Sequence, residues 1–466
     1  MKFIDRIEPL AFLNRQYAER RAQFIAIYGK RRVGKTELIK QFFADKPHIY
    51  FLADKTSAHD QLKTLSAKLG EFYQDSFLSE RGFGKWEQVF AYLKTKEQFV
   101  WIVDEFPYLV ESDSAIPSLF QKGWDEYLKD SQVFLILAGS SIGMMETEVL
   151  GYRSPLYGRR TGQLLLHPMD FTDSRQFFPR LNFEEALSFY AVCGGVPAYL
   201  LEFKPQVDLW TNIRDRVLSP ATFLYPEPEF ILREELREPR NYFAILKAMA
   251  AGKTKIGELV NETGFPKSKL SKYLSVLTDL KIVEREIPVT EEKPEKSKRG
   301  IYQLTDYFFR FWFEFVFPYR SDLEGGEVDT VLKKIKQGFP LYLSTVYENV
   351  ARESALIWAR QGRLPFRLNR VGRYWEKDAE IDLVCLDEEN DVILFGEAKW
   401  TNRLMSIGIY EQLKQKAKRV AWKKETRNEF YILFSRNGFS DELKTQAKTE
   451  ALFLVEGDRL YPKSPS

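Results

Sequence analysis

The stretch FIAIYGKRRVGKTELIKQFF, residues 24–43, decides the fold of the first half of the chain. Residues 29–36 fit the pattern G-x-x-x-x-G-K-[ST] at every fixed position. The apolar run before them predicts a buried strand, and the run after them predicts a helix. Glycines let such a loop curl so that its N–H groups point at phosphate oxygens, and the helix adds its N-terminal partial charge. The stretch therefore predicts a P-loop that binds ATP.

The side chains of this loop also predict how ATP and Mg²⁺ are held. Lys35 is expected to reach the β and γ phosphates, and the Thr36 hydroxyl is expected to ligate Mg²⁺. A second apolar strand, at 99–103, ends in Asp104 and Glu105. Asp104 is expected to hold Mg²⁺ through water, and Glu105 is expected to polarise the attacking water as a general base. The sequence thus predicts ATP hydrolysis as well as ATP binding.

Two further residue pairs are candidates for sensing the γ phosphate. Ser140 and Ser141 end the apolar strand VFLILAG, where the alternative role is a helix cap. Arg159 and Arg160 lie in SPLYGRRTG, from which an arginine finger would reach the nucleotide of a neighbouring subunit, and the alternative is a surface ion pair. The expected nucleotide-binding residues are Gly29, Lys30, Arg31, Arg32, Val33, Gly34, Lys35, Thr36, Asp104, Ser140 and Ser141, and the expected catalytic residues are Lys35, Glu105, Arg159 and Arg160.

Length and composition limit the class of protein. The 466 residues are too many for one core, and about three domains are expected. The formal net charge of +3 means that affinity for nucleic acid has to come from local patches. Two distant cysteines and three scattered histidines suit a reduced cytoplasm and argue against a disulfide framework or a zinc site. The N-terminus does not resemble a signal peptide, and the aromatic run 307–319 is shorter than the roughly 20 residues of a bilayer span, so no membrane partner is expected.

The order of apolar patterns predicts a multidomain chain of α/β class. Residues 1–175 alternate apolar runs with helical segments, which predicts an open parallel sheet. Residues 176–236 lack strand alternation and predict a helical lid. Residues 237–320 hold three short helices and then two strands around a charged loop, the layout of a winged helix-turn-helix. Residues 321–330 are polar and contain a glycine pair, which predicts a linker to a last α/β domain at 335–466.

Several segments in about the first 235 residues resemble the archaeal and bacterial ATPases of the AAA-related, additional-strand P-loop group. They are FIDRIEPL, the P-loop, VWIVDEF, LAGSS, SPLYGRR and CGGVP. The resemblance implies a strand inserted between the P-loop strand and the strand that ends in Asp104, with Ser140 or Ser141 on it. It also implies that Asp5 and Arg6 lie near the adenine and that GGVP belongs to the lid. The residues IEP at 7–9 depart from the more acidic stretch that is usual in the family.

Basic residues of the winged helix predict contact with DNA phosphates, which is expected to be sensitive to salt. Lys267, Lys269 and Lys272 lie on the third helix, and Lys293, Lys296, Lys298 and Arg299 lie in the wing. The first turns of the third helix contain no Arg, Asn or Gln, so sequence-specific recognition of bases is not expected. The alternative is a winged helix that serves as a protein contact or a rigid spacer.

The last domain predicts a cluster of carboxylates on a β-hairpin. EIDLVCL and VILFGEAKW are expected strands joined by the turn DEEND, and this pairing sets Asp382 opposite Gly396 and Glu397. Glu397 and Lys399 are two residues apart and face the same side. Such a set can hold Mg²⁺ and polarise water against a phosphodiester, with Glu348 as a third carboxylate. The expected metal ligands of the chain are Thr36, Asp104, Glu348, Asp382 and Glu397, and the catalytic residues of this domain are Asp382, Glu397 and Lys399.

This arrangement, over about residues 335–460, resembles the restriction-endonuclease-like fold with its Asp…Glu-x-Lys, or PD-(D/E)xK, signature. One subgroup of the ATPase family carries that fold after a winged helix. The helix at 408–422 is basic and predicts a groove that attracts a polyanion, while the alternative is a solvated helix. Its polar residues include Gln412, Lys414, Lys416, Lys418 and Arg419. The carboxylate cluster has its own alternative, an inactive structural relic.

Three functional interpretations follow from the sequence. The preferred one is a cytoplasmic ATPase that processes nucleic acid, DNA rather than RNA, and whose ATP occupancy gates the nuclease-like domain. In the second, ATP changes the oligomeric state or the DNA affinity, and the C-terminal domain is an inert platform. The third, a metabolic kinase on the same P-loop, is disfavoured by the acidic strand end, the lid and the winged helix.

Overall fold

The computed structural model describes residues 3–236, 238–377 and 379–461, so the outer limits of the first and last predicted domains lie outside the described residues. The chain forms two compact units. The first contains Met1–Met169, Val196–Ala198 and Asp279–Lys281. The second contains Asp170–Gly195, Tyr199–Thr278 and Ile282–Ser466.

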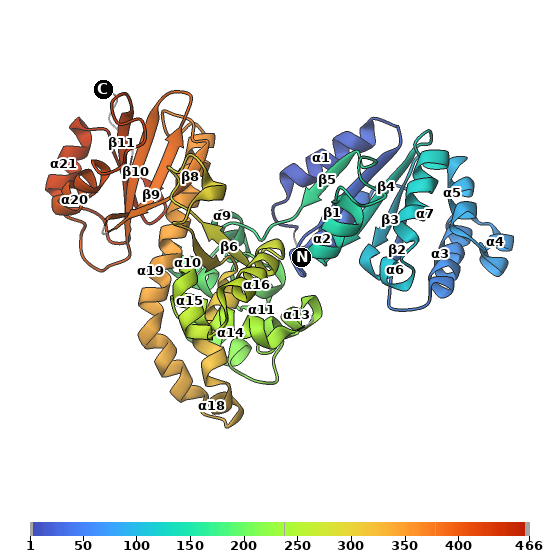
Figure 1. Ribbon diagram of the computed structural model, residues 1–466, viewed down its shortest axis with the longest axis horizontal. Coiled ribbons are helices and arrows are strands. Elements are labelled where there is room, and N and C mark those ends of the chain that lie inside the picture. The colour runs from blue at the N-terminus through green and yellow to red at the C-terminus, as the bar shows by residue number, and fades with distance from the viewer. Residues whose placement is uncertain (1–2, 237, 378, 462–466) are drawn as a thin grey trace. The chain divides into compact units, whose positions relative to one another are not determined.

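The first unit is built on a five-stranded sheet in the order β2-β3-β4-β1-β5 (Figure 1). All of its strand pairs are parallel. The strands are β1 (Gln23–Tyr28), β2 (His48–Leu52), β3 (Phe99–Asp104), β4 (Val133–Gly139) and β5 (Gly162–Leu165). Because β4 pairs with both β1 and β3, the inserted strand that the family resemblance implied is confirmed.

Alternate side chains of these strands enter two separate cores, one on each face of the sheet. Ile25 and Ile27 of β1 pack with α1 and α2, whereas Phe24 and Ala26 pack on the opposite face with α3 and α5–α7. Burial on both faces explains why β1, β3 and β4 are continuous apolar runs. The helices are α1 (Ile7–Ala18), α2 (Lys35–Phe43), α3 (Ala58–Tyr73), α4 (Ser76–Arg81), α5 (Trp86–Lys94), α6 (Phe106–Ser112), α7 (Ile116–Gly123) with the π turn η1 (Trp124–Leu128), and α8 (Ile142–Met144) with η2 (Met145–Leu150).

The second unit starts with short helices and continues into the winged helix. The first helical segments are α9 (Phe171–Ser174), η3 (Arg175–Phe177), α10 (Phe183–Cys193), α11 (Pro197–Glu202), α12 (Leu209–Asn212), η4 (Ile213–Val217) and α13 (Glu227–Glu235). The winged helix comprises α14 (Pro239–Ala250), α15 (Ile256–Thr263), α16 (Lys267–Asp279), β6 (Val283–Glu286), η5 (Pro294–Lys296) and β7 (Ile301–Leu304). Strands β6 and β7 pair antiparallel, so the predicted three helices and hairpin are confirmed.

The aromatic run after the wing forms a broken helix inside the second unit. Its parts are α17 (Tyr307–Phe311), η6 (Trp312–Val316) and η7 (Phe317–Tyr319). Every residue of α17 except Arg310 is buried, and the Trp312 indole donates a hydrogen bond of 2.7 Å to the Tyr225 carbonyl. Among the described residues, no helix combines the length and the apolar character that crossing a membrane requires.

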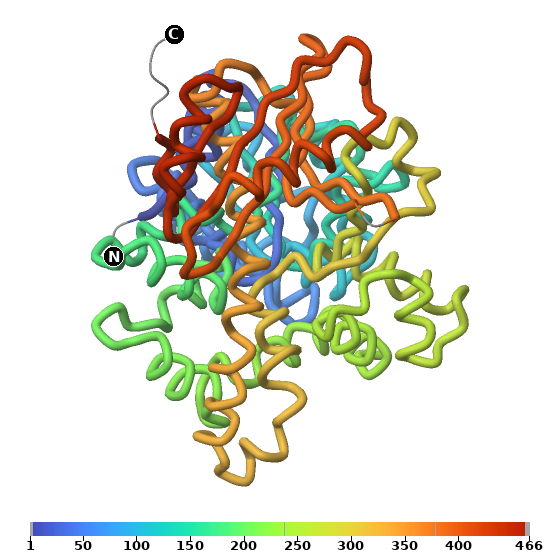
Figure 2. The backbone as a smooth tube through the Cα atoms, turned by 90° about the vertical axis from the view of Figure 1, so that its left-hand side faces the viewer, coloured from blue at the N-terminus to red at the C-terminus, as the bar shows by residue number. Residues whose placement is uncertain are grey.

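The predicted linker at 321–330 is mostly helical, which corrects that expectation. Helix α18 (Arg320–Glu324) is followed within a few residues by α19 (Val328–Arg360), the long helix that stands out in Figure 2. Leu323, Val331 and Ile335 are buried, so the segment packs with one apolar side although most of its residues are polar. The ten residues from 321 to 330 are split between two helices, so too few turns of either helix fall in this window for its apolar spacing to be recognised.

The C-terminal sheet has six strands in the order β13-β12-β11-β10-β9-β8. Strands β8, β9 and β10 are antiparallel, while β10, β11 and β12 are parallel. The predicted hairpin is confirmed, because Asp387 pairs with Val392 and Leu383 pairs with Gly396. The elements are β8 (Arg370–Glu376), β9 (Ala379–Asp387), β10 (Val392–Lys399), α20 (Ile407–Ala417), β11 (Asn428–Ser435), α21 (Asp441–Thr449), β12 (Leu452–Glu456) and β13 (Arg459–Leu460).

One buried hydroxyl ties three helices of the second unit together. Tyr342 of α19 lies within hydrogen-bonding distance of two carbonyls, that of Ala191 at 2.7 Å and that of Tyr307 at 2.9 Å. We expect Tyr342→Phe to lower the free energy of unfolding by about 1–3 kcal/mol, because buried carbonyls lose their donor. Calorimetry should show a Tm lower by a few degrees. Tyr152→Phe, at a residue that is 84% exposed, is the control, and an equal Tm for both variants would contradict this role.

Candidate functional site

The backbone of residues 29–36 curls at the carboxyl end of β1. Gly29 and Gly34 have φ values of 153° and 93°, and Arg32 also has a positive φ of 68°. A Cβ on Gly29 would lie 2.4 Å from the Leu166 carbonyl oxygen, so a side chain at this position would require a shift of the backbone. Helix α2 begins at Lys35, directly after the curl. The loop therefore has the open concave backbone and the helix N-terminus that hold phosphates.

Lys35 and the Asp104 carboxylate occupy the inside of this loop region. The buried Lys35 ammonium donates to the carbonyls of Gly29 at 2.9 Å and Lys30 at 3.0 Å. Asp104, which is 2% exposed, accepts hydrogen bonds from the Thr36 hydroxyl at 3.2 Å and from the Tyr50 hydroxyl. Burial and the neighbouring Asp104 carboxylate raise the pKa of Tyr50, so the phenol stays a donor. A hydroxyl beside a carboxylate at the mouth of the P-loop suits the coordination of Mg²⁺ with ATP.

Glu105 is the N-cap residue directly before α6 and has a left-handed φ of 52°, and Ser140 contacts its carboxylate. The Ser140 hydroxyl donates to one oxygen at 2.6 Å, and the Ser140 N–H donates to the other at 3.2 Å. Ser141 is the N-cap of α8. The inserted strand β4 thus brings the predicted sensor and the predicted general base into direct contact.

The predicted arginines of the first unit have partners within the chain. Arg6 donates to the carbonyl of Val33 in the P-loop at 3.0 Å, and its expected position near the adenine stays a prediction. Arg31 donates to the Tyr108 hydroxyl at 3.2 Å. Arg159 forms an ion pair of 3.0 Å with Asp125, and Arg160 donates to the Leu150 carbonyl at 3.2 Å. The finger role of Arg159 and Arg160 toward another subunit stays a prediction.

The predicted cluster of the last domain comes together where β9 and β10 pair. The Lys399 ammonium lies 2.7 Å from Glu397 Oε1 and 3.7 Å from Asp382 Oδ2. Asp382 Oδ2 also accepts a hydrogen bond of 3.1 Å from the Ala398 N–H. Glu397 is only 6% exposed, so its charge is compensated by lysine rather than by water.

The pKa values of this cluster reflect burial and the closeness of like charges. Burial and the Asp382 carboxylate raise the pKa of Glu348 to about 7. Burial and the Glu397 carboxylate raise the pKa of Asp382 above its ordinary value. Burial alone would lower the pKa of Lys399, but Asp382 and Glu397 raise it overall. Glu348 therefore shares the electrostatic environment of the predicted site.

Two basic residues that the sequence did not assign to this cluster are part of it. Lys416 of α20 lies 3.1 Å from both carboxylate oxygens of Glu397. Arg352 of α19 donates to the Asp382 carbonyl at 2.8 Å. Arg352 follows Glu348 by four residues, and this helical spacing was the signal that could have found it. Lys416 of the basic helix α20 therefore points at the cluster, whereas the sequence predicted this helix only as the lining of a groove that attracts a polyanion.

The acidic residues of the cluster do not all converge on one point. Within the parts of the chain that the structure describes, no three His, Cys, Asp or Glu side chains are grouped closely enough to hold a metal ion. Asp382 and Glu397 form a carboxylate pair on adjacent strands, and the lysines beside them supply the positive charge. A pair of carboxylates completed by water is a common Mg²⁺ site, so these two residues fit the ion better than the predicted set of three.

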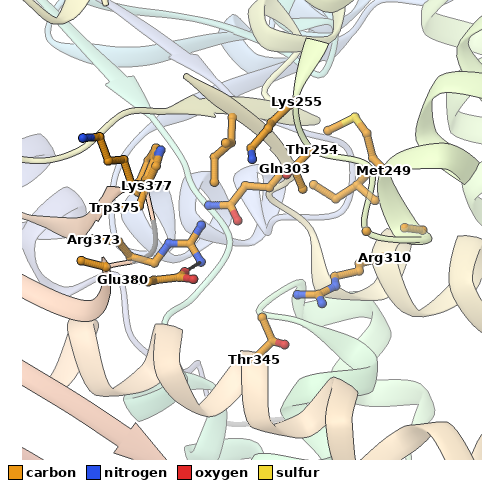
Figure 3. A pocket seen from close by; sticks show the side chains of 15 residues that line it. Met249, Thr254, Lys255, Gln303, Arg310, Thr345, Arg373, Trp375, Lys377 and Glu380 are labelled. Carbon is orange, nitrogen blue, oxygen red and sulfur yellow. Dashed lines mark ion pairs between the residues drawn. The ribbon is translucent and has the colours of Figure 1, made fainter. Parts of the chain in front are cut away.

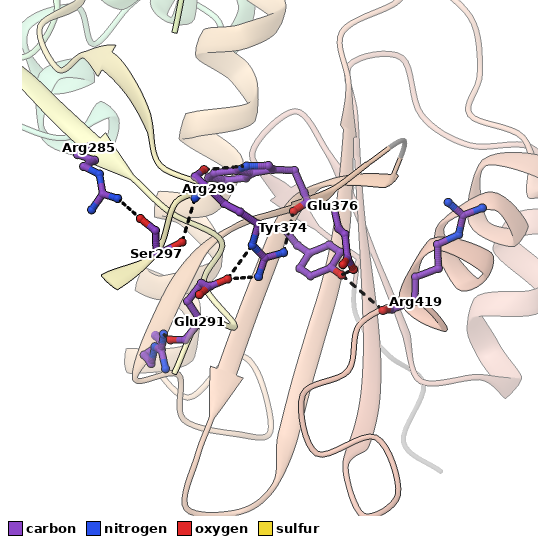
Figure 4. Close-up of polar contacts among 9 residues, drawn as sticks. Arg285, Glu291, Ser297, Arg299, Tyr374, Glu376 and Arg419 are labelled. Atoms are coloured by element: carbon purple, nitrogen blue, oxygen red, sulfur yellow. Dashed lines mark hydrogen bonds and ion pairs between the residues drawn. The ribbon is translucent and has the colours of Figure 1, made fainter. Parts of the chain in front are cut away.

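The wing is attached to the edge of the C-terminal sheet. Val289 N–H donates to the Arg373 carbonyl of β8 at 2.9 Å, and Val289 packs in the core of the last domain. Arg299 pairs with Glu291 and donates to the Trp375 carbonyl at 3.3 Å (Figure 4). Arg299 therefore contacts protein rather than facing DNA as predicted. The other basic residues predicted to face DNA are exposed, namely Lys267, Lys269, Lys272, Lys293, Lys296 and Lys298.

Comparison with protein families agrees with this order of modules. Residues 3–203 match the family described as an ATPase domain predominantly from Archaea. Residues 243–285 match bacterial regulatory proteins of the arsR family, a helix-turn-helix family. Residues 312–420 match a family described as archaeal and bacterial proteins of unknown function. The first two matches cover the P-loop unit and the winged helix, and the third covers the predicted Asp382, Glu397 and Lys399 cluster.

The proteins similar to the chain include two relatives from one archaeon and two solved structures. Protein MJECL04 of Methanocaldococcus jannaschii is 37% identical over 398 residues, which are 85% of this chain and 87% of that protein. The ATP-binding protein MJ0423 of the same organism is 52% identical over 44 residues, 9% of this chain and 75% of that protein. The Walker-type ATPase PABY2304 of Pyrococcus abyssi matches 67% of this chain and 96% of its own at 21% identity, with a TM-score of 0.48. The ORC2 protein of Aeropyrum pernix matches 72% and 96% at 12% identity, with a TM-score of 0.42.

The raised pKa of Glu348 predicts a dependence of stability on pH. Because the folded chain binds this proton more tightly than the unfolded chain, the stabilising effect is complete below pH about 4.5 and is lost as the pH rises through about 7. Glu314 and Glu353, whose pKa values burial also raises to about 7, act in the same direction. We expect Glu348→Gln to reduce the fall in Tm between pH 5 and 8 without abolishing it. Glu442→Gln, at an exposed residue, is the control, and identical slopes for both variants would contradict the assignment.

Proposed function

The chain belongs to the family of protein MJECL04 of Methanocaldococcus jannaschii and is an ATPase, and we propose that it engages DNA and cleaves it in its C-terminal domain. The observation that carries the proposal is the convergence of Asp382, Glu397 and Lys399 at the paired strands β9 and β10. We place this ATPase in the AAA-related class with a cytoplasmic location. ATP occupancy is proposed to gate the C-terminal domain.

The geometry of the first unit suggests how hydrolysis proceeds. The Lys35 ammonium lies inside the loop and donates hydrogen bonds to two carbonyls of the loop. When ATP binds, the γ phosphate would replace these carbonyls as the acceptor. Thr36 and Asp104 would hold Mg²⁺, which supplies positive charge against the phosphate oxygens when it is bound. Glu105 would accept the proton of the attacking water, while Ser140 orients the carboxylate that it already contacts.

Glu105→Gln tests this assignment. We expect the variant to bind ATP normally and to hydrolyse it about 10²- to 10⁴-fold more slowly, because the amide cannot accept the proton. Binding is measured by calorimetry and hydrolysis by phosphate release. Lys35→Ala is expected to lose ATP binding as well, whereas Glu111→Gln, at an exposed residue of α6, should retain both. If the Glu105 variant hydrolyses ATP at the parent rate, Glu105 is not the general base.

We propose that the winged helix contributes the DNA contact. Lys267, Lys269 and Lys272 of α16 are exposed, and the match to a helix-turn-helix regulatory family supports DNA rather than RNA as the partner. Lysines on this helix would pair with phosphates, so the binding should weaken steeply with salt. We further propose that the ATPase assembles with copies of itself through Arg159 and Arg160, which requires Arg159 to leave Asp125.

The cluster of the last domain supports phosphodiester hydrolysis by its own residues. Asp382 and Glu397 would hold Mg²⁺, which polarises water and the phosphate when bound. Lys399, which contacts Glu397 at 2.7 Å, would orient the attacking water and stabilise the charge that develops on the phosphate. The hairpin followed by the parallel strand β11 and the helix α20 supports the resemblance to the restriction-endonuclease-like fold.

Lys399→Ala tests the cleavage. With Mg²⁺, with and without ATP, we expect the parent chain to cut DNA and the variant to lose about 10²-fold or more of the rate, since a group acting in the transition state is removed. DNA binding should stay within about twofold, because exposed lysines elsewhere supply most phosphate contacts. Lys448→Ala on α21 is the control at an exposed residue. The substrates are duplex DNA, single-stranded DNA and RNA.

One observation favours a second function, a nucleotide-dependent switch that binds DNA without cutting it. Glu397 is ion-paired with two lysines, Lys399 and Lys416, an arrangement that is stable without any metal ion. If the well-folded parent chain cuts none of the substrates in any nucleotide state, the switch replaces the nuclease. In that case ATP should still change the affinity for DNA or the oligomeric state.

A further inference from the structure

A polar cavity of about 460 Å³ lies within the second unit, where the wing meets the last domain. Its walls come from the turn after α14, from β7, from the aromatic helix, from α19 and from β8 and β9. Figure 3 shows Gln303, Arg373, Trp375 and Glu380 gathered on one side, with Arg310 and Thr345 across from them. The docking of the wing on β8 creates this cavity, so it belongs to neither module alone.

The charges of the cavity suit an anion. Among the residues that the structure describes, four basic ones, Lys255, Arg310, Arg373 and Lys377, line it together with one acidic one, Glu380. Lys255 and Lys377 are exposed, whereas Arg373 is only 14% exposed and is fixed by ion pairs of 3.1 Å to Glu286 and 3.5 Å to Glu380. Lys255 and Lys377 have flexible side chains whose charge can follow a phosphate. The charge of the Arg373 guanidinium is held in a fixed position.

Other groups in the cavity suit a base. The Trp375 indole N–H donates to the Arg299 carbonyl at 3.1 Å, which fixes the ring. A fixed aromatic ring offers a face on which any base can stack. The Gln303 amide and the Thr254 hydroxyl add hydrogen-bonding groups on the same lining. A phosphate and a base together make one nucleotide.

Two elements connect the lining of the cavity to the residues of the cluster around Asp382. Glu380 and Asp382 are two residues apart on β9 and therefore face the same side. Thr345, Glu348 and Arg352 follow one another at helical spacing along one face of α19. Thr345 lines the cavity, and Arg352 contacts the Asp382 carbonyl at 2.8 Å. Strand β9 and helix α19 thus each carry residues of the cavity and residues of the cluster.

We propose that this cavity binds one nucleotide of a single-stranded nucleic acid whose chain continues to the Asp382, Glu397 and Lys399 cluster. The proposal rests on the proposed function for the position of the cleaved bond. A duplex is too wide for a cavity of about 460 Å³, whereas one unstacked nucleotide fits. Duplex DNA would bind α16 instead. The chain would then bind duplex and single-stranded nucleic acid at two different places.

The test measures binding without cleavage. A fluorescein-labelled single strand of DNA is titrated, without Mg²⁺, with the full chain carrying Lys399→Ala. Adding Lys255→Gln and Lys377→Gln should weaken binding on the order of tenfold and reduce the salt slope by about 1.4, since two phosphate contacts of a single strand are lost. The matched control adds Lys444→Gln and Lys448→Gln on α21, which remove the same charge from exposed residues. Equal affinities for the two pairs would overturn the proposal.

Two further readouts keep the result specific. A strand that contains 4-thiothymidine should crosslink on irradiation to the peptide that carries Trp375 or to the peptide that carries Gln303, and crosslinks confined to α16 would overturn the proposal. Duplex binding should change less than twofold in the cavity variants, whereas an equal loss for duplex would show a general charge effect and would also overturn it. Thymidine monophosphate at millimolar concentration should compete weakly. If thymidine monophosphate binds but the cavity variants bind the single strand as tightly as the control does, the cavity holds a free nucleotide and the proposal of strand binding fails.

Strand binding by the cavity and cleavage by the C-terminal domain are tested separately, so one can fail while the other holds. If the parent chain cuts no nucleic acid but the cavity variants still lose strand binding, the nuclease proposal fails and the binding site stands. If the parent cuts DNA but the cavity variants bind and cut like the control, the nuclease stands and the cavity has no role in holding the strand.

Discussion

The carboxyl ends of β1, β3 and β4 meet at one edge of a parallel sheet, and the nucleotide site depends on this meeting. Asp104 illustrates it, because donors from three elements converge on its carboxylate, namely the Thr36 hydroxyl, the Tyr50 hydroxyl and the Glu105 N–H. These donors satisfy the oxygens of a carboxylate that is only 2% exposed. The strand order therefore determines both where the acid lies and why it can be buried there.

The second unit also buries carboxylates, and there they lie on an antiparallel hairpin. Pairing of β9 with β10 brings Asp382 beside Glu397, and two buried like charges would repel each other without compensation. Lysines from β10 and α20 supply that compensation, and α19 covers the same face with Glu348 and Arg352. The buried carboxylates are thus neutralised by cations from the same chain rather than by water.

The local parts of this architecture were predictable, and the long-range parts were not. The P-loop, the acidic strand end and the hairpin register follow from spacing within about 20 residues, where period and turn chemistry act directly. The contact of Ser140 with Glu105 needed the inserted strand, which only a family resemblance supplied. Lys416 and Arg352 joined the cluster through tertiary packing, and the linker at 321–330 proved helical because its apolar residues pack, although its composition is polar.

The wing shows how one tertiary contact changes the meaning of a motif. A wing usually suggests a second DNA contact, yet here Val289 extends the hydrogen bonding of the edge strand β8, and Arg299 exchanges hydrogen bonds with Trp375. An edge strand that is covered in this way is protected from pairing with other chains. The same contact fixes the winged helix to the domain that carries Asp382 and Glu397. The winged helix and the carboxylate cluster therefore belong to one compact unit.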